Sequence, residues 1–365
     1  MFVGVFMNWI INGHSVIEIV LVTFLVSVFL VPIAKKIAHH VGAIDMPNER
    51  KVHKGAMPRM GGLAIYGAFL LGYILYGQLT TQMLSILIGS FIIVILGMID
   101  DIKPLRASHK FLVQIIAASI VVIYGQVYFS QISFLGLHLE FSTIVSYILS
   151  IFFIVAISNA INLIDGLDGL AGGVSSIYFL TISLIAILLS KTTGLDFLLS
   201  LIMLGSTLGF LFHNFPPAKI FMGDSGSLFL GFMISVIALV SFKVATFTSL
   251  IIPLVVLAIP IFDTGLAIVR RLLKGESIGS PDKEHFHHQL LKLKFSPRVS
   301  IIIIYSINIL FSAVSIFYVI GYNRQAIVLY LILMLALLFV ILKTDILYNH
   351  NVKEDKIKKV KKSRK

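Results

Sequence analysis

Residues 143–163, TIVSYILSIFFIVAISNAINL, form an apolar run that is long enough to cross a bilayer as a helix. A second apolar run occupies residues 169–190, and the residues between the two runs are rich in carboxylates and glycines. The end of the first run and this connection place polar side chains at intervals of three, namely Asn159, Asn162, Asp165 and Asp168. The pattern predicts two membrane helices joined by a short polar segment.

The composition of the whole chain is that of a polytopic membrane protein. Of 365 residues, 58% are hydrophobic and 13% are charged, and the mean hydropathy is +1.00, whereas a soluble domain carries roughly 25% charged residues. The chain has no Cys, which excludes disulfides and thiolate metal sites. A spanning segment must satisfy its own backbone, and the alternating pattern of a membrane barrel is absent. We therefore predict an all-α polytopic integral membrane protein.

Apolar runs recur along the chain and predict about eleven transmembrane helices. The predicted helices are 16–38, 60–77, 83–99, 111–130, 143–163, 169–190, 196–213, 225–242, 248–270, 299–320 and 327–344. They form a single domain over residues 1–344, which is followed by a basic tail, 345–365. The polar loops expected on one side of the membrane lie near 39–59, 100–110, 164–168, 214–224 and 271–298.

The basic residues predict the orientation of these helices. With the N-terminus outside, all but three of the 29 Lys and Arg residues lie on the inner side, the exceptions being Lys191, Lys243 and Arg324. This bias predicts an outer N-terminus and a cytoplasmic C-terminus. The acidic residues follow the same division, since all but three of 17 lie at the inner face, the exceptions being Glu18, Glu140 and Asp196. The chemistry is therefore expected at the cytoplasmic face.

Paired carboxylates, Asp100 and Asp101, end the third predicted helix. The carboxyl end of a helix is unfavourable for anions by roughly a few tenths of a kcal/mol each. Such a pair requires cations, supplied either by a metal ion or by the nearby Lys103, Arg106 and Lys110. Interfacial carboxylates without a function are the alternative interpretation.

Asp165 and Asp168 are harder to explain structurally. An ionised Asp deep in a membrane helix costs about 2.5–3.5 kcal/mol, and like charges three residues apart on a helix repel. Capping of the following helix explains one carboxylate, but it does not explain both together with Asn159 and Asn162. These four side chains are therefore candidates for a ligand site.

The segment FMGDSGS (221–227) places Asp224 between two glycines, just before a predicted helix. Backbone N–H groups at such a position bind anions, although the Gly-Lys-Ser/Thr of a Walker loop is absent. Together with the other Asp-rich segments on the same side, it indicates an oxygen-ligand metal site. Mg²⁺ binds in such sites through one or two carboxylates and phosphate oxygens.

The last cytoplasmic loop contains HFHH, with His285, His287 and His288. Zinc normally requires four ligands, and the basic neighbours Arg270 and Arg271 favour phosphate binding by these histidines instead. A solvated loop without function is the alternative.

Asp263 lies within the ninth predicted helix, where a carboxylate is a functional candidate by default. An inward-facing Asp paired with Arg270 or Arg271 is an equally compatible interpretation. Carboxylates, amides, histidines and cations at one membrane boundary are typical of Mg²⁺-assisted phosphoryl transfer. The membrane position implies that one reactant is a lipid.

Four sets of segments resemble the polyprenyl-phosphate N-acetylhexosamine-1-phosphate transferases, a glycosyltransferase 4 type of family. They are DMPNERKVHKGAMPRMGGL (45–63), DDIKPLRASHK (100–110), NAINLIDGLDGLAGG (159–173) with FMGDSGSLFLGF (221–232), and DKEHFHHQLL (282–291). The most similar branch is the undecaprenyl-phosphate N-acetylglucosamine-1-phosphate transferases that begin wall teichoic acid or related polymers.

The resemblance implies a reaction in which UDP-N-acetylglucosamine and undecaprenyl phosphate give undecaprenyl-pyrophosphoryl-N-acetylglucosamine and UMP. It also implies a Mg²⁺ cofactor, for which Mn²⁺ is a substitute, and an enzyme of the cell membrane whose active site faces the cytoplasm. No nucleic-acid partner is expected. The sequence leaves the oligomeric state open, with a homodimer as one option.

The resemblance also suggests roles for individual residues. Asp224 matches the principal metal ligand, and Asp165 is a second metal candidate. Asp100 and Asp101 match paired acids that deprotonate or position the lipid phosphate, and a phosphate with a second pKa of about 6 needs little deprotonation. The catalytic candidates are thus Asp100, Asp101, Asp165, His287 and His288. The substrate-binding candidates are His53, Arg59, Lys110, Asn159, Asn162, Asp168, Asn214, Arg270, Arg271 and His285.

One difference from a related family bears on the identity of the sugar donor. The related phospho-N-acetylmuramoyl-pentapeptide transferases carry three consecutive His and a Thr-Pro-Thr-Met-Gly-Gly motif, where this chain has HFHH and MPRMGG. This difference disfavours a muramoyl-pentapeptide donor, although that donor and other UDP-N-acetylhexosamines remain the alternatives. An ion-coupled transporter is a more distant alternative to the enzyme, because buried acids on interrupted helices also bind ions.

Overall fold

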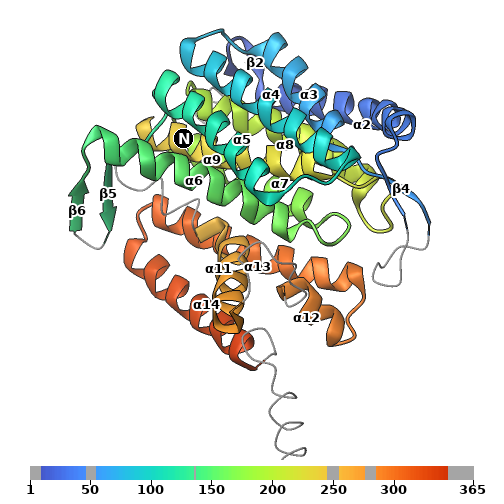
Figure 1. The fold of residues 1–365 in the computed structure, drawn as a ribbon. Coiled ribbons are helices and arrows are strands. Elements are labelled where there is room, and N and C mark those ends of the chain that lie inside the picture. The colour runs from blue at the N-terminus through green and yellow to red at the C-terminus, as the bar shows by residue number, and fades with distance from the viewer. Residues whose placement is uncertain (1–9, 47–54, 135–136, 245–254, 276–284, 344–365) are drawn as a thin grey trace, which may run out of the picture.

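The computed structural model describes residues 10–46, 55–134, 137–244, 255–275 and 285–343, which form a bundle of helices (Figure 1). Within these residues, nine helices are long and apolar enough to cross a membrane, so the chain is a multi-pass membrane protein. They are α2 (Val16–Val41), α4 (Thr81–Ile102), α5 with the π-helical turn η1 (Ala107–Ser119 and Ile120–Tyr124), α6 (Thr143–Ile164), α7 (Leu170–Leu188), α8 (Leu195–Asn214), α9 (Asp224–Val244), α13 (Pro297–Val319) and α14 (Asn323–Lys343). A shorter apolar helix, α3, covers Gly62–Tyr76. The predicted helical membrane architecture is confirmed.

In the described part of the chain, three short strand pairs occur, one before α2 and two in connections between helices. All three are antiparallel: β1 (Ile10–Ile11) with β2 (His14–Ser15), β3 (Ile44–Asp45) with β4 (Met57–Pro58), and β5 (Gln131–Phe134) with β6 (Leu137–Glu140). The helix predicted over 111–130 is too long, because η1 ends at Tyr124 and Gln126 has a left-handed backbone conformation with φ +53°.

The span predicted over 248–270 requires a larger correction. Residues 245–254 lie outside the described residues, and the helix observed here, α11, covers Ala258–Lys274. Asp263 and Arg270 of α11 are buried, whereas Val269 and Leu272 are exposed. The helix therefore turns a polar stripe toward the protein, which a hydropathy window does not detect. The predicted loop over 271–298 also contains a helix, α12 (Phe286–Lys292).

Local signals account for where the other helices begin and end. The Ser15 hydroxyl accepts a hydrogen bond from Glu18 N at the start of α2, and the Thr80 hydroxyl accepts one from Met83 N at the start of α4. Gly42 ends α2 in the left-handed conformation, with φ +77°. The loop expected over 100–110 is shorter in the structure, because α4 ends at Ile102 and α5 begins at Ala107.

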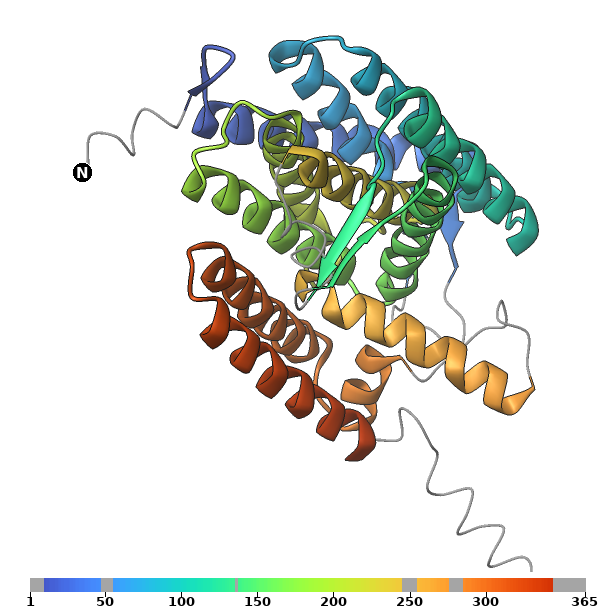
Figure 2. The ribbon, with the colours of Figure 1, turned by 90° about the vertical axis from the view of Figure 1, so that its left-hand side faces the viewer.

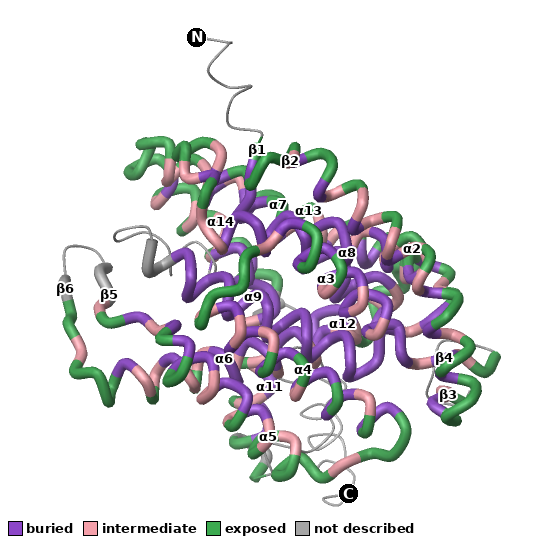
Figure 3. Tube along the Cα trace, turned by 90° about the horizontal axis from the view of Figure 1, so that it is seen from above, coloured by how far each residue is buried: buried purple, intermediate pink, exposed green. Residues whose placement is uncertain are grey.

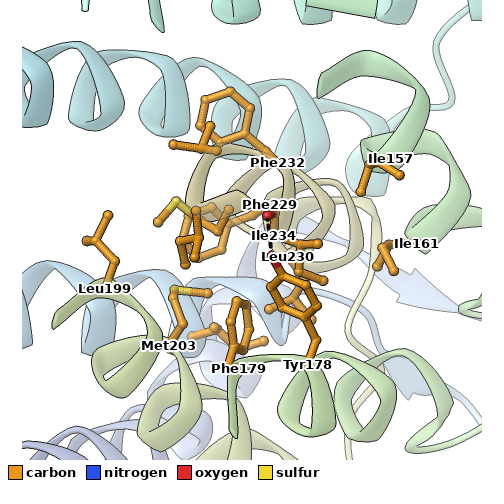
Figure 4. Packing of buried hydrophobic residues seen from close by; sticks show 14 of the residues in the cluster. Ile157, Ile161, Tyr178, Phe179, Leu199, Met203, Phe229, Leu230, Phe232 and Ile234 are labelled. Carbon is orange, nitrogen blue, oxygen red and sulfur yellow. Dashed lines mark hydrogen bonds between the residues drawn. The ribbon is translucent and has the colours of Figure 1, made fainter. Parts of the chain in front are cut away.

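Helix α9 forms the centre of the bundle. Its apolar span, Asp224–Ser241, is wholly buried, whereas only 11% of the α14 span is buried. Helices α3, α4, α6, α7 and α8 pack around α9, and the buried trace runs through the middle of the bundle in Figure 3. Aromatic side chains fill this core, and the Tyr178 hydroxyl donates a hydrogen bond to Ile234 O at 3.1 Å (Figure 4).

The C-terminal helices form a separate group beside this core. Figure 2 shows α11, α12, α13 and α14 on one side of the body that α2 to α9 build. Helix α13 packs on α7, and α11 packs on α6. This placement brings α12 to the end of the bundle where α6 ends and α9 begins.

Candidate active site

The ends of several helices converge at one end of the bundle. Helix α4 ends with Asp100 and Asp101 in its last turn, and α9 begins at Asp224. Lys110 lies in the first turns of α5, and Asp165 directly follows α6. The polar segments that the sequence placed on one membrane face therefore occur together.

Two glycines permit this close approach of α4 to α9. A Cβ on Gly97 would lie 2.3 Å from the backbone of Ser225, so that no side chain fits where the two helices meet. Gly223 has φ +72°, and a Cβ there would lie 2.4 Å from the Asp101 carboxylate. The glycine of FMGDSGS thus allows a tight turn against a carboxylate.

Asp101 caps the start of α9. Its Oδ1 accepts a hydrogen bond from Asp224 N at 2.7 Å, and its Oδ2 accepts bonds from Ser225 N at 3.1 Å and Ser225 Oγ at 2.7 Å. The Arg59 Nε lies 3.1 Å from Asp101 Oδ1, and the Asp101 side chain is fully buried. A carboxylate at a helix N-terminus satisfies free N–H groups and the helix dipole. Asp101 therefore holds Asp224 in place.

Asp224 lies between two cations. The Arg59 Nη2 is 2.7 Å from Asp224 Oδ1, and the Lys110 Nζ is 2.5 Å from Asp224 Oδ2. Lys110 also reaches Asp100 Oδ2 at 3.3 Å, while Asp100 Oδ1 accepts a hydrogen bond from Leu105 N at 2.8 Å. Lys110 thus bridges the carboxylates of α4 and α9.

Arg59 is brought to this cluster by the backbone. The Phe221 N–H donates to Pro58 O at 2.9 Å, and the Gly61 N–H donates to Phe221 O at 2.9 Å, which pairs the segment around Arg59 with the approach to α9. Burial opposes the charge of Arg59, but Asp101 and Asp224 more than offset it and raise the guanidinium pKa above its ordinary value. Arg59 therefore stays charged.

Asp165 is the least constrained carboxylate of the cluster. It is partly buried, and its side chain accepts no hydrogen bond from any residue that the structure describes. Burial raises the pKa of Asp165 to about 7; Arg59 opposes this rise and Asp224 adds to it. One turn earlier, the Asn162 amide donates to Ser227 Oγ at 2.8 Å and so ties α6 to the first turn of α9.

Asp168 and Asn214 connect two loops. Asp168 Oδ2 accepts a hydrogen bond from Ala218 N at 3.0 Å, and Asn214 Oδ1 accepts one from Gly169 N at 2.8 Å. The Asn214 amide also donates to Ile220 O at 2.8 Å. Both side chains therefore hold the loop after α6 against the segment that leads into α9.

Helix α13 provides two further contacts to these loops that sequence reasoning missed. The Tyr305 hydroxyl donates to Gly169 O at 2.5 Å, and the Arg298 Nε donates to Pro216 O at 3.0 Å. Tyr305 lies inside an apolar helix with no motif around it, so nothing in the sequence indicates this contact. Arg298 carries only the general signal of an inner-face cation.

The three histidines gather at the start of α12. The rings of His285 and His287 are parallel within 2° at a centroid distance of 5.8 Å, and His288 lies 4.2 Å from His287. His287 is 2% exposed, and a Cβ on Gly166 would lie 2.4 Å from its Nε2, which places this imidazole against the loop after α6. Burial lowers the pKa of His287 to about 3, so the ring is neutral at physiological pH.

Of the four remaining predicted site residues, the structure describes three. Asn159 pairs with Gln114 of α5, with its Nδ2 2.5 Å from Gln114 Oε1, and so fastens α5 to α6. Arg270 and Arg271 are buried near the end of α11. His53 lies outside the described residues.

The helices and the charged cluster define a membrane protein that gathers carboxylates and cations at one end of its bundle. The sequence profile of glycosyl transferase family 4 matches residues 83–242. A relative in Bacillus subtilis (strain 168), a probable undecaprenyl-phosphate N-acetylglucosaminyl 1-phosphate transferase, is 47% identical over 300 residues, which cover 80% of this chain and 83% of the relative.

Two other relatives match over a similar length. The decaprenyl-phosphate N-acetylglucosaminephosphotransferase of Mycolicibacterium smegmatis is 35% identical over 77% of this chain and 76% of its own length. The undecaprenyl-phosphate alpha-N-acetylglucosaminyl 1-phosphate transferase of Escherichia coli (strain K12) is 30% identical over 82% of this chain and 81% of its own length. The chain belongs to glycosyl transferase family 4.

Proposed function

We propose that this protein transfers N-acetylglucosamine 1-phosphate from UDP-N-acetylglucosamine to undecaprenyl phosphate, releasing UMP. Three similar relatives are named for transfer of this phosphosugar to a polyprenyl phosphate, two of them to undecaprenyl phosphate. The observation that carries the proposal is the cluster of Asp100, Asp224, Lys110 and Arg59 at the end of a membrane bundle. The product is the first lipid-linked intermediate of teichoic acid or a related envelope polymer.

Mg²⁺ fits the donor set of this cluster. The carboxylates of Asp224 and Asp165 offer the hard oxygen ligands that Mg²⁺ prefers. Within the described residues no group of three acidic or histidine side chains forms a complete cage, as is common for Mg²⁺, which keeps waters and takes further ligands from substrate phosphates. In this proposal Asp224 is the principal ligand and Asp165 the second, with Mn²⁺ as a substitute. The bound ion supplies charge neutralisation for the pyrophosphate.

The reaction forms one bond and breaks one. An oxygen of the lipid phosphate attacks the sugar-bearing phosphorus, and the bond from that phosphorus to the oxygen bridging it to the uridine-bearing phosphate breaks, so that UMP leaves. Charge accumulates on phosphate oxygens during this step, and positioned cations are the main catalytic device for such transfers. Lys110 and Arg59 supply that charge from the protein.

The neutral His287 contributes a different interaction. Because the imidazole carries no charge at physiological pH, it acts through a hydrogen bond rather than as a cation. Its Nε2 has no partner among the described residues and lies beside Gly166. In this proposal His287 and His288 act on a phosphate or sugar oxygen next to the loop that carries Asp165.

The proposal includes the location of the enzyme. The Lys and Arg bias of the sequence supports an orientation in which the end of the bundle that carries Asp224 lies on the inner side of the cytoplasmic membrane. UDP-sugars reach the site from the cytosol, and the lipid phosphate reaches it from the inner leaflet.

The proposal is tested by measuring the release of UMP. The reaction contains purified protein, undecaprenyl phosphate, Mg²⁺ and radiolabelled UDP-N-acetylglucosamine. Parallel reactions contain UDP-N-acetylgalactosamine or UDP-N-acetylmuramoyl-pentapeptide. Lipid-dependent release with UDP-N-acetylglucosamine alone is expected. Release with only another sugar would change the donor, and no release from folded protein with any of the three would refute the transferase.

A further inference from the structure

Asp263 of α11 is a buried carboxylate that the proposed chemistry does not use. It is 3% exposed and, together with His287, lines a small cavity whose other walls are apolar side chains of α6, α7, α11, α12 and α13. An ionised carboxylate in such surroundings requires hydrogen-bond donors, because water is not available to solvate it. The hydrogen-bond donors to the Asp263 carboxylate therefore indicate its role.

Both donors come from the start of α12. The His285 Nδ1 lies 3.0 Å from Asp263 Oδ2, and the Phe286 N–H donates to Asp263 Oδ1 at 2.8 Å. His285 is the N-cap residue of α12 and its side chain makes no capping bond to the helix, so Asp263 supplies the cap from another helix. One carboxylate thus fixes both the backbone and the side chain at the first residues of the His motif.

This contact also determines the hydrogen position on His285. A carboxylate only accepts hydrogen bonds, so Nδ1 of His285 carries the hydrogen. The His285 ring is in turn stacked on His287, whose Nε2 points at Gly166 in the loop that carries Asp165. A chain of contacts therefore runs from Asp263 through His285 to His287 and the loop that carries Asp165.

We infer that Asp263 is a positioning residue that holds His285 and the first turn of α12 so that His287 and His288 face the phosphosugar site. The inference rests on the proposed function, because it assigns the motif a role in that reaction. Asp263 itself does not touch the reacting atoms. Its removal changes the rate only through the placement of the histidines.

The test compares Asp263→Asn with a matched substitution at the opposite end of the bundle. Asp196 of α8 is also a buried carboxylate, 8% exposed, with its Oδ2 2.9 Å from Ser241 Oγ. Each variant is purified in detergent, its folded fraction is measured by size-exclusion chromatography, and kcat and KM for UDP-N-acetylglucosamine are referred to that fraction. We expect Asp263→Asn to lower kcat at least 30-fold and to change KM less than threefold, and we expect Asp196→Asn to leave both within threefold.

A double-mutant cycle separates positioning from general stability. If Asp263 acts through His285, the kcat of the Asp263→Asn, His285→Gln double variant equals that of the slower single variant within threefold. Losses that multiply would overturn the inference, as would a folded Asp263→Asn protein with normal kcat. If Asp263→Asn does not fold, His285→Gln alone decides, since normal kcat there overturns the inference and a 30-fold loss supports it. Absence of UMP release by the unmodified protein would instead refute the proposed function.

Discussion

The Lys110 ammonium occupies the position at Asp224 that a metal ion would contest. Its Nζ lies 2.5 Å from Asp224 Oδ2 and 3.3 Å from Asp100 Oδ2, so one cation joins two carboxylates from different helices. In the proposed cycle, Mg²⁺ and Lys110 compete for the same oxygens. A Mg²⁺ ion held by Asp224 would leave Lys110 available to the substrate phosphate.

Lys110→Gln is therefore expected to have opposite effects on metal binding and on turnover. Loss of the competing charge should increase Mg²⁺ affinity several-fold, while loss of the phosphate contact should lower kcat by about 10²-fold. Thermal unfolding followed against Mg²⁺ concentration, together with UMP release, measures both quantities. Lys191→Gln, at the opposite end of the bundle, is the control. Weaker Mg²⁺ binding by Lys110→Gln would show that the lysine does not compete for Asp224.

The two carboxylates Asp101 and Asp165 are expected to respond differently to substitution by Asn. Asp101 accepts hydrogen bonds from Asp224 and Ser225 at the start of α9, so Asp101→Asn should destabilise the protein by about 1–3 kcal/mol. Asp165 accepts none within the described residues, and burial raises its pKa, so Asp165→Asn should leave stability unchanged or increase it. Both variants should lose most of their activity.

Unfolding in detergent with EDTA, which removes divalent cations, gives the stability difference, and UMP release gives the activity. Equal destabilisation by the two substitutions would mean that Asp165 is as much a structural residue as Asp101. Full activity of Asp165→Asn would remove it from the proposed site.

The helix ends and the polar cluster could be predicted from the sequence because each has a local signal. The apolar run of α6 ends where its amides and carboxylates begin, and α9 begins at the Asp of FMGDSGS. The different contacts of the acidic residues could not be predicted, because they depend on which helix each carboxylate faces. Asp101 points at the first N–H groups of α9, whereas its neighbour Asp100 accepts a hydrogen bond from Leu105 N.

Helix α11 shows a second reason why sequence reasoning fell short. A hydropathy window averages over all faces of several helical turns, and therefore cannot tell a lipid-facing helix from one that buries Asp263 and Arg270 toward the protein. Tyr305 shows a third, since a single hydroxyl in an apolar helix contacts the loop after α6 across a long sequence separation.

Tyr305→Phe tests the contact between α13 and that loop. The substitution removes one O–H donor to Gly169 O and is expected to cost about 1 kcal/mol of stability. Because the loop carries Asp165, kcat should also fall several-fold. Tyr318→Phe, near the other end of α13, is the matched control and should have neither effect. Wild-type kcat in Tyr305→Phe would show that the loop keeps its position without the hydroxyl.

His287 predicts a pH dependence of stability. Its pKa is lowered in the folded protein from the ordinary 6.5 to about 3, so the unfolded chain binds the extra proton between these two values. Stability is therefore fully present above pH 6.5 and is lost as the pH falls toward 3, by on the order of a few kcal/mol. His287→Gln cannot titrate and should lose less stability over this window.

Unfolding temperatures of the two proteins measured from pH 7 to pH 4 show whether this holds. A constant difference between them over the whole range would mean that His287 does not remain neutral in the folded state. A difference that narrows as the pH falls is the expected result.

In the proposed reaction the sugar moves together with its phosphate. UDP-N-acetylglucosamine labelled with ³²P at the sugar-bearing phosphate distinguishes this reaction from transfer of the sugar alone. With undecaprenyl phosphate and Mg²⁺, we expect the label to appear in the lipid product while unlabelled UMP accumulates. Label recovered in UDP, with the sugar on the lipid, would contradict it.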